Sequence, residues 1–300
     1  MRLFITGATG FIGRHLLYHL ATVRDVEVAV LASPGHEADL ADHRVIPGRL
    51  EDLASWKQSL IDWKPDACIH LAWYAEPGKY LYSNQNVALL QQSLDLMQTL
   101  IEAKCESVVM VGTCAEYDTS AGYLQETGAT KPDTIYATAK LALALMAERM
   151  AQDAGIHFAW ARMFYLYGPE EDQRRLVPAL INALLQGERF ATTKGEQVRD
   201  YVHVADAARA LWQLVQGGHS GIYNISSGYP ATIHDLIMTV ADLLDARELV
   251  DIGAMPYRQW EPMFICGDNS RLRATGWEPQ FSLQTGLAQT VAWWKQWVAQ

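Results

Sequence analysis

The sequence predicts an α/β fold: a doubly wound parallel sheet with a smaller, interleaved C-terminal lobe. Three observations lead to this prediction. Apolar strand-like runs alternate with helix-like stretches through the first half of the chain, a glycine-rich turn follows the first run, and the alternation weakens after Tyr167-Gly168-Pro169. The 300 residues, half of them hydrophobic, are enough to bury one large unit with a second lobe.

The first half of the chain supplies the expected sheet and its crossover helices. Short apolar runs bounded by turn residues predict strands at Arg2–Thr6, Val26–Ala32, Ala67–Leu71, Ser107–Gly112 and His157–Arg162. Apolar residues that recur with a helical period predict helices at Phe11–Leu20, Ser83–Ala103 and Ile135–Ala154. Strands joined by crossover helices are typical of a parallel sheet that is covered on both faces.

The second half of the chain is expected to contribute segments to both the sheet domain and the smaller lobe. Helix-like stretches separated by Gly- and Pro-rich segments lie at Arg175–Gln186, Val204–Val215, Ile233–Leu244 and Leu283–Val298. We expect residues 1–165 and about 196–226 to form the sheet domain. The smaller lobe is expected from about 166–195 and 227–300.

Composition and charge exclude several classes of protein. A formal charge of −10 argues against a broad nucleic-acid-binding surface. No apolar run approaches the roughly 20 residues that a membrane-spanning helix requires, and Met1-Arg2 leads straight into a strand without a secretory signal. We therefore expect a cytoplasmic protein with neither a nucleic-acid nor a membrane partner. No metal site is expected, because the cysteines lack paired ligand spacing: Cys68, Cys105, Cys114 and Cys266.

A glycine-rich loop between the first strand and the first helix predicts dinucleotide binding. Gly7 permits a tight turn, Gly10 lets the backbone approach a pyrophosphate, and Gly13 allows the helix to pack closely on the strand. The N-terminus of the helix favours the phosphate charge. The residues expected along the cofactor are Gly7, Thr9, Gly10, Phe11, Ile12, Gly13, Leu50, Leu71 and Ala72.

The end of the second strand bears on the choice of cofactor. An acidic residue there would bind the ribose hydroxyls of NAD, but the position holds Ala32 or Ser33, and Asp25 and Glu27 lie too early. Without a carboxylate to repel it, a 2′-phosphate is acceptable, which favours NADP(H) and leaves NAD(H) as the alternative. The candidate partners of that phosphate are Arg14, otherwise a plain surface residue of its helix, and His36.

A tyrosine and a lysine four residues apart open the predicted helix Ile135–Ala154. Tyr136 and Lys140 share one helix face, so the ammonium group is expected to lower the phenol pKa from its ordinary value near 10. Such a phenol is a general acid/base for an alcohol oxygen. Thr113 follows the strand Ser107–Gly112, at the strand end where ligands of parallel sheets bind, and its hydroxyl can hydrogen-bond the substrate.

These motifs resemble the extended short-chain dehydrogenase/reductase family, and the resemblance covers nearly the whole chain. It implies a Rossmann-type sheet domain that binds the dinucleotide, a substrate-binding lobe, and catalysis by Thr113, Tyr136 and Lys140, the last two also touching the cofactor. Members with the full set are nucleotide-sugar epimerases, dehydratases and reductases. The matching segments are Thr6–Gly13, His70-Leu71-Ala72, Asn86-Val87, Arg162–Pro169, Arg199–Val204, Asn224–Gly228 and Gly276–Pro279.

The resemblance also implies residues that bind the substrate. Arg199 matches the arginine that binds the diphosphate of the nucleotide sugar, which suits its bidentate geometry, and Arg258 is a second candidate. The alternatives are a salt link between the domains for Arg199 and a plain surface position for Arg258. Trp73 and Tyr165 are expected either to shape the sugar pocket or to belong to the core. The segment Trp73–Tyr82 is expected as a loop over the active site.

Departures from the family pattern narrow the chemistry. The 4,6-dehydratases follow the threonine with an Asp-Glu pair, whereas this chain has Cys114 and Ala115, so dehydration is not expected. Cys114 is therefore placed in the substrate pocket as a neutral residue. Glu116 comes one place later, where it either approaches the sugar or caps the chain locally.

Three functions remain open from the sequence. The first is reduction at C4 of a nucleotide-linked 4-keto-6-deoxyhexose by NADPH, and the second is 4-epimerisation with tightly held NAD. The absence of a ribose-binding acid at Ala32-Ser33 favours the reductase. The third, a non-catalytic dinucleotide sensor, would not need Tyr136 and Lys140.

The helices Ser83–Ala103 and Ile135–Ala154 carry more apolar surface than one sheet face covers. Relatives pair these two helices with those of a second copy, so we expect a homodimer. The apolar residues concerned are Leu89, Leu90, Leu94, Leu141, Leu145 and Met146.

Overall fold

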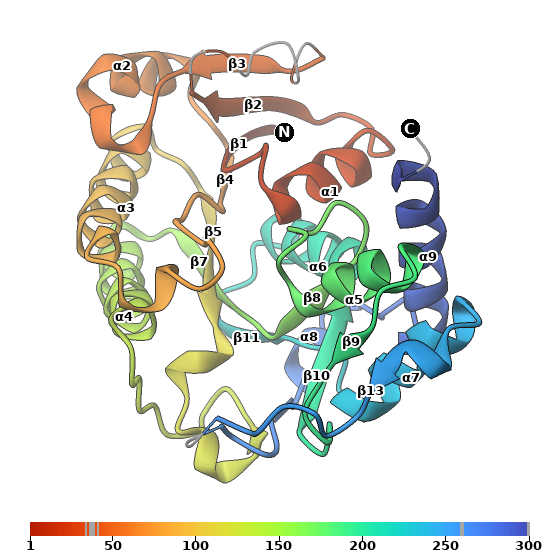
Figure 1. The fold of residues 1–300 in the computed structure, drawn as a ribbon. Coiled ribbons are helices and arrows are strands. Elements are labelled where there is room, and N and C mark those ends of the chain that lie inside the picture. Colours follow the sequence, from red (N-terminus) through yellow and green to blue (C-terminus); the bar gives the residue numbers. More distant parts are fainter. Residues whose placement is uncertain (34, 36–39, 41, 259–260, 299–300) are drawn as a thin grey trace.

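The computed structural model describes residues 1–33, 35, 40, 42–258 and 261–298. A seven-stranded parallel sheet forms its centre, in the order β11-β7-β5-β4-β1-β2-β3 (Figure 1). The chain thus runs outward from β1 to one edge and then crosses to build the other half, which confirms the doubly wound fold. The strands are β1 (Arg2–Thr6), β2 (Glu27–Ala32), β3 (Arg44–Pro47), β4 (Ala67–His70), β5 (Ser107–Thr113), β7 (His157–Met163) and β11 (Gly221–Ile225).

Helices cover both faces of this sheet (Figure 1). On one face, α1 (Phe11–Leu20) and α6 (Val204–Gln216) pack their buried residues against the strands. The other face is covered by α2 (Leu53–Trp63), α3 (Gln85–Glu102) and α4 (Ile135–Ala154). Both faces are apolar because a parallel sheet between two helix layers has no side in water.

Local signals set the ends of the helix that carries Tyr136. The Thr134 side chain accepts the N–H of Ala137 at 3.1 Å, an N-cap that starts α4. Gly155 ends the helix in the left-handed conformation, with φ at 70°. Tyr136 and Lys140 therefore lie in the first two turns, next to the end of β5.

The smaller lobe has a sheet and a core of its own (Figure 1). In this sheet β10 (Val198–His203) pairs in parallel with β8 (Tyr165–Tyr167) and antiparallel with β12 (Pro230–Thr232). Three helices enclose the core: α5 (Leu176–Leu185), α7 (Ile233–Leu243) and α9 (Leu283–Val298). Short elements complete the lobe and its borders, namely β6 (Tyr123–Leu124), β9 (Phe190–Ala191), β13 (Val250–Asp251), β14 (Cys266–Gly267) and α8 (Ser270–Arg273).

Asp200 ties the two sheets together. Its carboxylate is fully buried on β10 and accepts the backbone N–H groups of Ser227 at 2.7 Å, Gly228 at 3.0 Å and Gly267 at 3.2 Å. A buried carboxylate is stable where several donors compensate its lost hydration. The strand β10 is thereby fastened to the segment that follows β11 and to β14.

Most predicted elements are confirmed, with β1, α1, α4 and α9 matching to the residue. Three were missed. β3 is a four-residue edge strand and β11 lies far along the chain, so neither has a local signal for its pairing. The helix α2 does carry a local signal, because Leu53, Trp56, Leu60 and Trp63 recur with a helical period, and the prediction overlooked it. Across the described residues, no helix is both long and apolar enough to cross a membrane.

Candidate active site

The glycine loop brings β1, α1 and the end of β4 into close contact. Gly7 has φ at +74°, and a Cβ there would lie 2.7 Å from the backbone nitrogen of Ala72. A Cβ on Gly13 would collide with the carbonyl oxygen of Gly7, so α1 packs on the loop only with glycine at that position. These approaches are the ones predicted for a phosphate-binding loop.

The N-terminus of α1 is suited to an anion. Gly10 is its N-cap, and no side chain in the described part of the chain caps the helix there. The first N–H groups of a helix lack partners within the helix and lie at the positive end of its dipole. A pyrophosphate group therefore fits this position, and the loop residues can hold a dinucleotide.

The second-strand end keeps its predicted neutral character. Ala32 is buried and Ser33 is half-buried at the end of β2, while Leu50 packs, half-buried, against the core under α2 and α3. His36, one candidate partner of a 2′-phosphate, lies outside the described residues.

The other candidate partner, Arg14, requires a correction. One terminal nitrogen of its guanidinium donates to the carbonyl of Thr9 at 2.7 Å, and the other donates to the carbonyl of Glu170 at 3.1 Å. Its Nε lies 2.5 Å from the Glu170 carboxylate. Arg14 thus joins α1 to the segment after β8, and this side chain is neither a plain surface residue nor directed at a 2′-phosphate.

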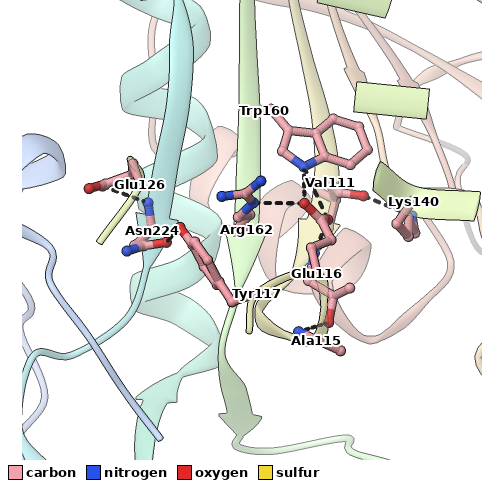
Figure 2. A network of polar contacts seen from close by, with 10 residues as sticks. Val111, Ala115, Glu116, Tyr117, Glu126, Lys140, Trp160, Arg162 and Asn224 are labelled. Carbon is pink, nitrogen blue, oxygen red and sulfur yellow. Dashed lines mark hydrogen bonds and ion pairs between the residues drawn. The ribbon is translucent and has the colours of Figure 1, made fainter. Parts of the chain in front are cut away.

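Thr113, Tyr136 and Lys140 come together at the carboxyl end of β5. The Thr113 hydroxyl lies close enough to Tyr136 to lower the pKa of its phenol. The ring of Tyr136 meets that of Tyr80 edge to face, with centroids 4.8 Å apart. Lys140 Nζ donates to the carbonyl of Val111 at 2.8 Å (Figure 2). Tyr136 and Lys140 thus lie beside Thr113 at the end of β5, and the use of the three residues in proton transfer stays a prediction.

The protonation of Tyr136 and Lys140 differs from the expectation. Burial raises the pKa of Tyr136, the neighbouring Tyr80 raises it further, and the Thr113 hydroxyl opposes the rise. Burial also lowers the pKa of Lys140 to about 7. The expected fall in the pKa of Tyr136 is not found, because desolvation is the largest effect on both side chains.

Trp73 contacts Lys140 from the side of α3, and Asn86 holds Trp73 in place. Lys140 Nζ lies 3.7 Å from the centroid of the Trp73 ring, a cation–π contact. Trp73 Nε1 donates to Asn86 Oδ1 at 2.9 Å, and Asn86 Nδ2 donates to the carbonyls of Tyr80 at 2.7 Å and Ser83 at 2.9 Å. The prediction therefore missed Asn86 and Tyr80 as supports of the site, although Asn-Val at a helix start after an aromatic-rich loop was a visible signal.

Cys114, Tyr165 and Arg199 gather near the same strand end. Arg199 is 4% exposed, and its guanidinium carbon lies 5.4 Å from the centroid of the Tyr165 ring. The Tyr165 ring also lies 5.7 Å from that of Tyr201. Burial raises the pKa of the Cys114 thiol to about 12, so this residue is neutral. The group forms a polar, largely neutral wall with one fixed positive charge.

Arg199 and Arg258 are placed differently. Arg199 forms an ion pair with Glu261 at 3.2 Å and donates to the carbonyl of Val198 at 2.9 Å, as the alternative of a salt link proposed. Arg258 is exposed, and no contact of its side chain with Arg199 or Tyr165 is found within the described ranges. The structure therefore does not bring the two arginines together.

Glu116 requires a second correction. It is fully buried, and its carboxylate accepts the N–H of Thr113 at 2.8 Å, Trp160 Nε1 at 3.0 Å and Arg162 Nε at 2.7 Å (Figure 2). Glu116 and Thr113 form a capping box around the 3-10 turn Cys114–Glu116. The carboxylate therefore does not approach a sugar, and the local cap is the observed arrangement. Trp160 and Arg162 are partners that sequence reasoning missed.

We predict that Lys140 makes stability depend on pH. Its pKa is about 7 in the folded chain and 10.5 when exposed, so between these values the unfolded chain binds more protons. The free energy of unfolding of the wild type, compared with Lys140→Met, should rise with pH above 7 by up to about 1.4 kcal/mol per unit. Urea unfolding at pH 7, 8 and 9 without added dinucleotide measures this. A constant difference between the two proteins would contradict the assignment.

Known proteins are similar to this chain in sequence over almost its whole length. The sequence profile of the NAD dependent epimerase/dehydratase family matches residues 3–226. The GDP-6-deoxy-D-mannose reductase of Pseudomonas aeruginosa is 28% identical, covering 98% of this chain and 97% of the relative. The UDP-glucose 4-epimerase of Halalkalibacterium halodurans is 26% identical, covering 99% and 96%.

Solved structures of such enzymes have the same fold as this chain. The UDP-glucose 4-epimerase of Thermus thermophilus, in complex with NAD, has a TM-score of 0.85 at 25% identity, covering 98% of this chain and 99% of that one. The UDP-glucose 4-epimerase of Thermotoga maritima shares the fold, with a TM-score of 0.88 at 23% identity, covering 99% and 100%. With its glycine loop, its Thr-Tyr-Lys grouping and a matching profile over most of its length, the chain belongs to the NAD dependent epimerase/dehydratase family of nucleotide-sugar-modifying enzymes.

Proposed function

We propose that this enzyme reduces the C4 keto group of a nucleotide-linked 4-keto-6-deoxyhexose with NADPH. The observation that carries the proposal is the pairing of a complete Thr113, Tyr136 and Lys140 set with neutral residues where related enzymes carry carboxylates. Those neutral residues are Cys114 and Ala115 after the threonine, and Ala32 and Ser33 at the end of β2. The similarity to a GDP-6-deoxy-D-mannose reductase supports the same reaction class.

In this reaction the bound cofactor supplies a hydride, and the chain supplies the proton and the positioning. Burial raises the pKa of Tyr136, so the phenol is protonated at neutral pH and can donate to the developing alkoxide. Thr113 holds the same oxygen by a hydrogen bond. The Lys140 ammonium stabilises the phenolate left after the transfer.

Dehydration is disfavoured by the same site. The elimination of water needs an acid and a base next to the sugar. Cys114 is a buried neutral thiol whose pKa is raised to about 12, and Ala115 has no titratable group. Glu116 is buried behind Thr113, and its carboxylate oxygens already accept hydrogen bonds from Thr113 and Arg162.

The alternative is 4-epimerisation with tightly held NAD. It is favoured by the similarity to UDP-glucose 4-epimerases in sequence and structure. The same Thr113, Tyr136 and Lys140 would serve it, so the retention of cofactor and the product decide between the two. A non-catalytic dinucleotide sensor is the remote alternative. Such a protein would not need Tyr136 and Lys140, so their presence argues against it.

For the substrate we propose the division of labour that the sequence suggested. Residues 1–165 and about 196–226 would bind the dinucleotide, and about 166–195 and 227–300 would bind the nucleotide sugar. Arg199 falls in the first of these units by sequence, but it lies on β10, in the sheet shared with β8 and β12. It would take the diphosphate in exchange for its ion pair with Glu261, and Arg258 would approach as a second cation. Trp73 and Tyr165 would border the sugar. We also keep the expectation of a cytoplasmic enzyme.

The test of the function combines cofactor and substrate. Thermal shifts with NAD, NADH, NADP and NADPH, and mass spectrometry of the protein as purified, identify the cofactor. NADPH oxidation is then followed with 4-keto-6-deoxy nucleotide sugars, first with the GDP-linked sugar. Tyr136→Phe should bind both ligands but lose turnover by roughly 10²- to 10⁴-fold. Retained NAD with interconversion of 4-epimers, and no reduction, would establish the epimerase instead.

The preference for NADP(H) gives a prediction at Ser33. We expect Ser33→Asp to weaken NADPH binding and to favour NADH, because a carboxylate at the end of β2 repels a 2′-phosphate and accepts ribose hydroxyls. Ser33→Asn, of nearly the same size but neutral, is the control and should keep the wild-type preference. Dissociation constants of both cofactors for the three proteins measure the effect. An equal loss in Asp and Asn variants would mean that charge is not the cause.

We also propose a homodimer that pairs α3 and α4 with those of a second copy. Val87 and Leu145 are each 61% exposed, and Met146 is 53% exposed on these helices. Met146→Glu should shift the mass in light scattering from dimer to monomer. Met255→Glu, at a methionine 52% exposed on another surface, should leave the mass unchanged. A monomeric wild type at micromolar concentration would reject the proposal.

A further inference from the structure

The carboxylate of Glu116 lies behind the proposed active site, directly beneath the end of β5. No surface of its side chain is exposed, and its three donors come from three places: the Thr113 backbone, the Trp160 indole and the Arg162 guanidinium (Figure 2). A buried charge persists only where such partners replace its hydration. The carboxylate therefore occupies a site that the fold has built for it.

The neighbouring backbone is shaped to admit this carboxylate. A Cβ on Gly112 would collide with Trp160 Nε1 and lie 2.5 Å from Glu116 Oε1. Gly112, Arg162 and Asn224 occupy one register row across β5, β7 and β11. In that row Arg162 stacks 4.2 Å from the Tyr117 ring centroid, and Tyr117 donates to Asn224 Oδ1 at 2.6 Å. Within this row it is Arg162 that fixes Glu116 against the sheet, through its ion pair with the carboxylate.

Thr113 is the residue on which this arrangement acts. Its N–H points to Glu116, and its Oγ1 accepts the N–H of Ala115 at 3.2 Å. With the oxygen accepting from Ala115, the hydroxyl proton is left for donation, and the neighbouring phenol of Tyr136, whose pKa this hydroxyl lowers, can take it. Both the backbone and the side-chain rotamer of Thr113 are thus set by the capping box that Glu116 closes.

From these contacts we infer that Glu116 is a positioning residue, which holds the Thr113 hydroxyl toward Tyr136 and the reacting oxygen of the substrate. Glu116 touches neither substrate nor cofactor, since it is fully buried. It acts through Thr113, and its charge is held in place by Arg162 and Trp160. The inference rests on the proposed use of Thr113 and Tyr136 in catalysis, and it holds equally for reduction and for epimerisation.

Glu116→Gln tests the inference, because an amide keeps one acceptor oxygen and its NH2 group must then face a donor, either the Arg162 guanidinium or the Thr113 N–H. We expect kcat to fall roughly 10- to 100-fold from the misplaced hydroxyl, with an unchanged KM and unchanged cofactor binding. Tyr117→Phe is the matched control: it breaks the Tyr117–Asn224 hydrogen bond in the same buried row but leaves the Thr113 contact, and should keep the wild-type kcat. An equal loss of kcat in the two variants would overturn the inference.

The pH profile separates positioning from stability. The charge of Glu116 raises the pKa of both Lys140 and Tyr136. Glu116→Gln should therefore move the alkaline limb of kcat for reduction to lower pH, whereas Tyr117→Phe should leave it in place. An unmoved limb in Glu116→Gln would count against the role of the carboxylate.

Two further measurements cover a failure of folding or of the proposed function. The double variant Glu116→Leu/Arg162→Leu removes both buried charges, a change that proteins often tolerate, and should fold while keeping the low kcat. Hydrogen exchange of the Thr113 amide, followed by NMR in the full chain, needs no substrate and should accelerate in Glu116→Gln but not in Tyr117→Phe. A wild-type exchange rate would refute the positioning role even if the enzyme proves to be an epimerase, and a wild-type kcat in the double variant would refute it as well.

Discussion

The site depends on a constraint that every parallel sheet meets at the carboxyl ends of its strands. Backbone groups there run out of ladder partners, yet they are too deeply placed to bond water. Three side chains supply partners at this edge: Lys140 for the carbonyl of Val111, Glu116 for the N–H of Thr113, and Thr6 for the N–H of Ala72. The side chains that satisfy these backbone hydrogen bonds thus include Lys140 and Glu116, which lie in or directly behind the proposed active site.

Burying charge at this edge has consequences for protonation. Desolvation raises the pKa of Tyr136 and lowers that of Lys140 to about 7, so two pKa values that are similar in water move apart. Glu116 raises both values from behind the strand, and Arg162 fixes the Glu116 charge. Burial thus favours the uncharged form of each side chain, and the Glu116 charge favours the protonated form of both.

A shift of one residue separates this site from that of the dehydratases it resembles. The carboxylate stands at position 116, after Cys114 and Ala115, and not directly after the threonine. In a 3-10 turn one residue rotates the side chain by about a third of a turn. The Glu116 carboxylate points into the sheet, where Gly112 leaves room for it. The acid thus becomes part of the scaffold.

Local patterns in the sequence determined much of this protein. Glycine spacing and a strand-to-helix transition identify the loop Gly7–Gly13, and a helix cap with a four-residue spacing places Tyr136 and Lys140 on one face, because these features involve only near neighbours. Other features depended on residues far apart in the chain. Arg14 is held by Glu170, Arg199 by Glu261, and Glu116 by Arg162. Only the tertiary structure decided these pairings, and with them the protonation of Tyr136, because a charge selects its partner and its hydration after distant strands have been brought side by side.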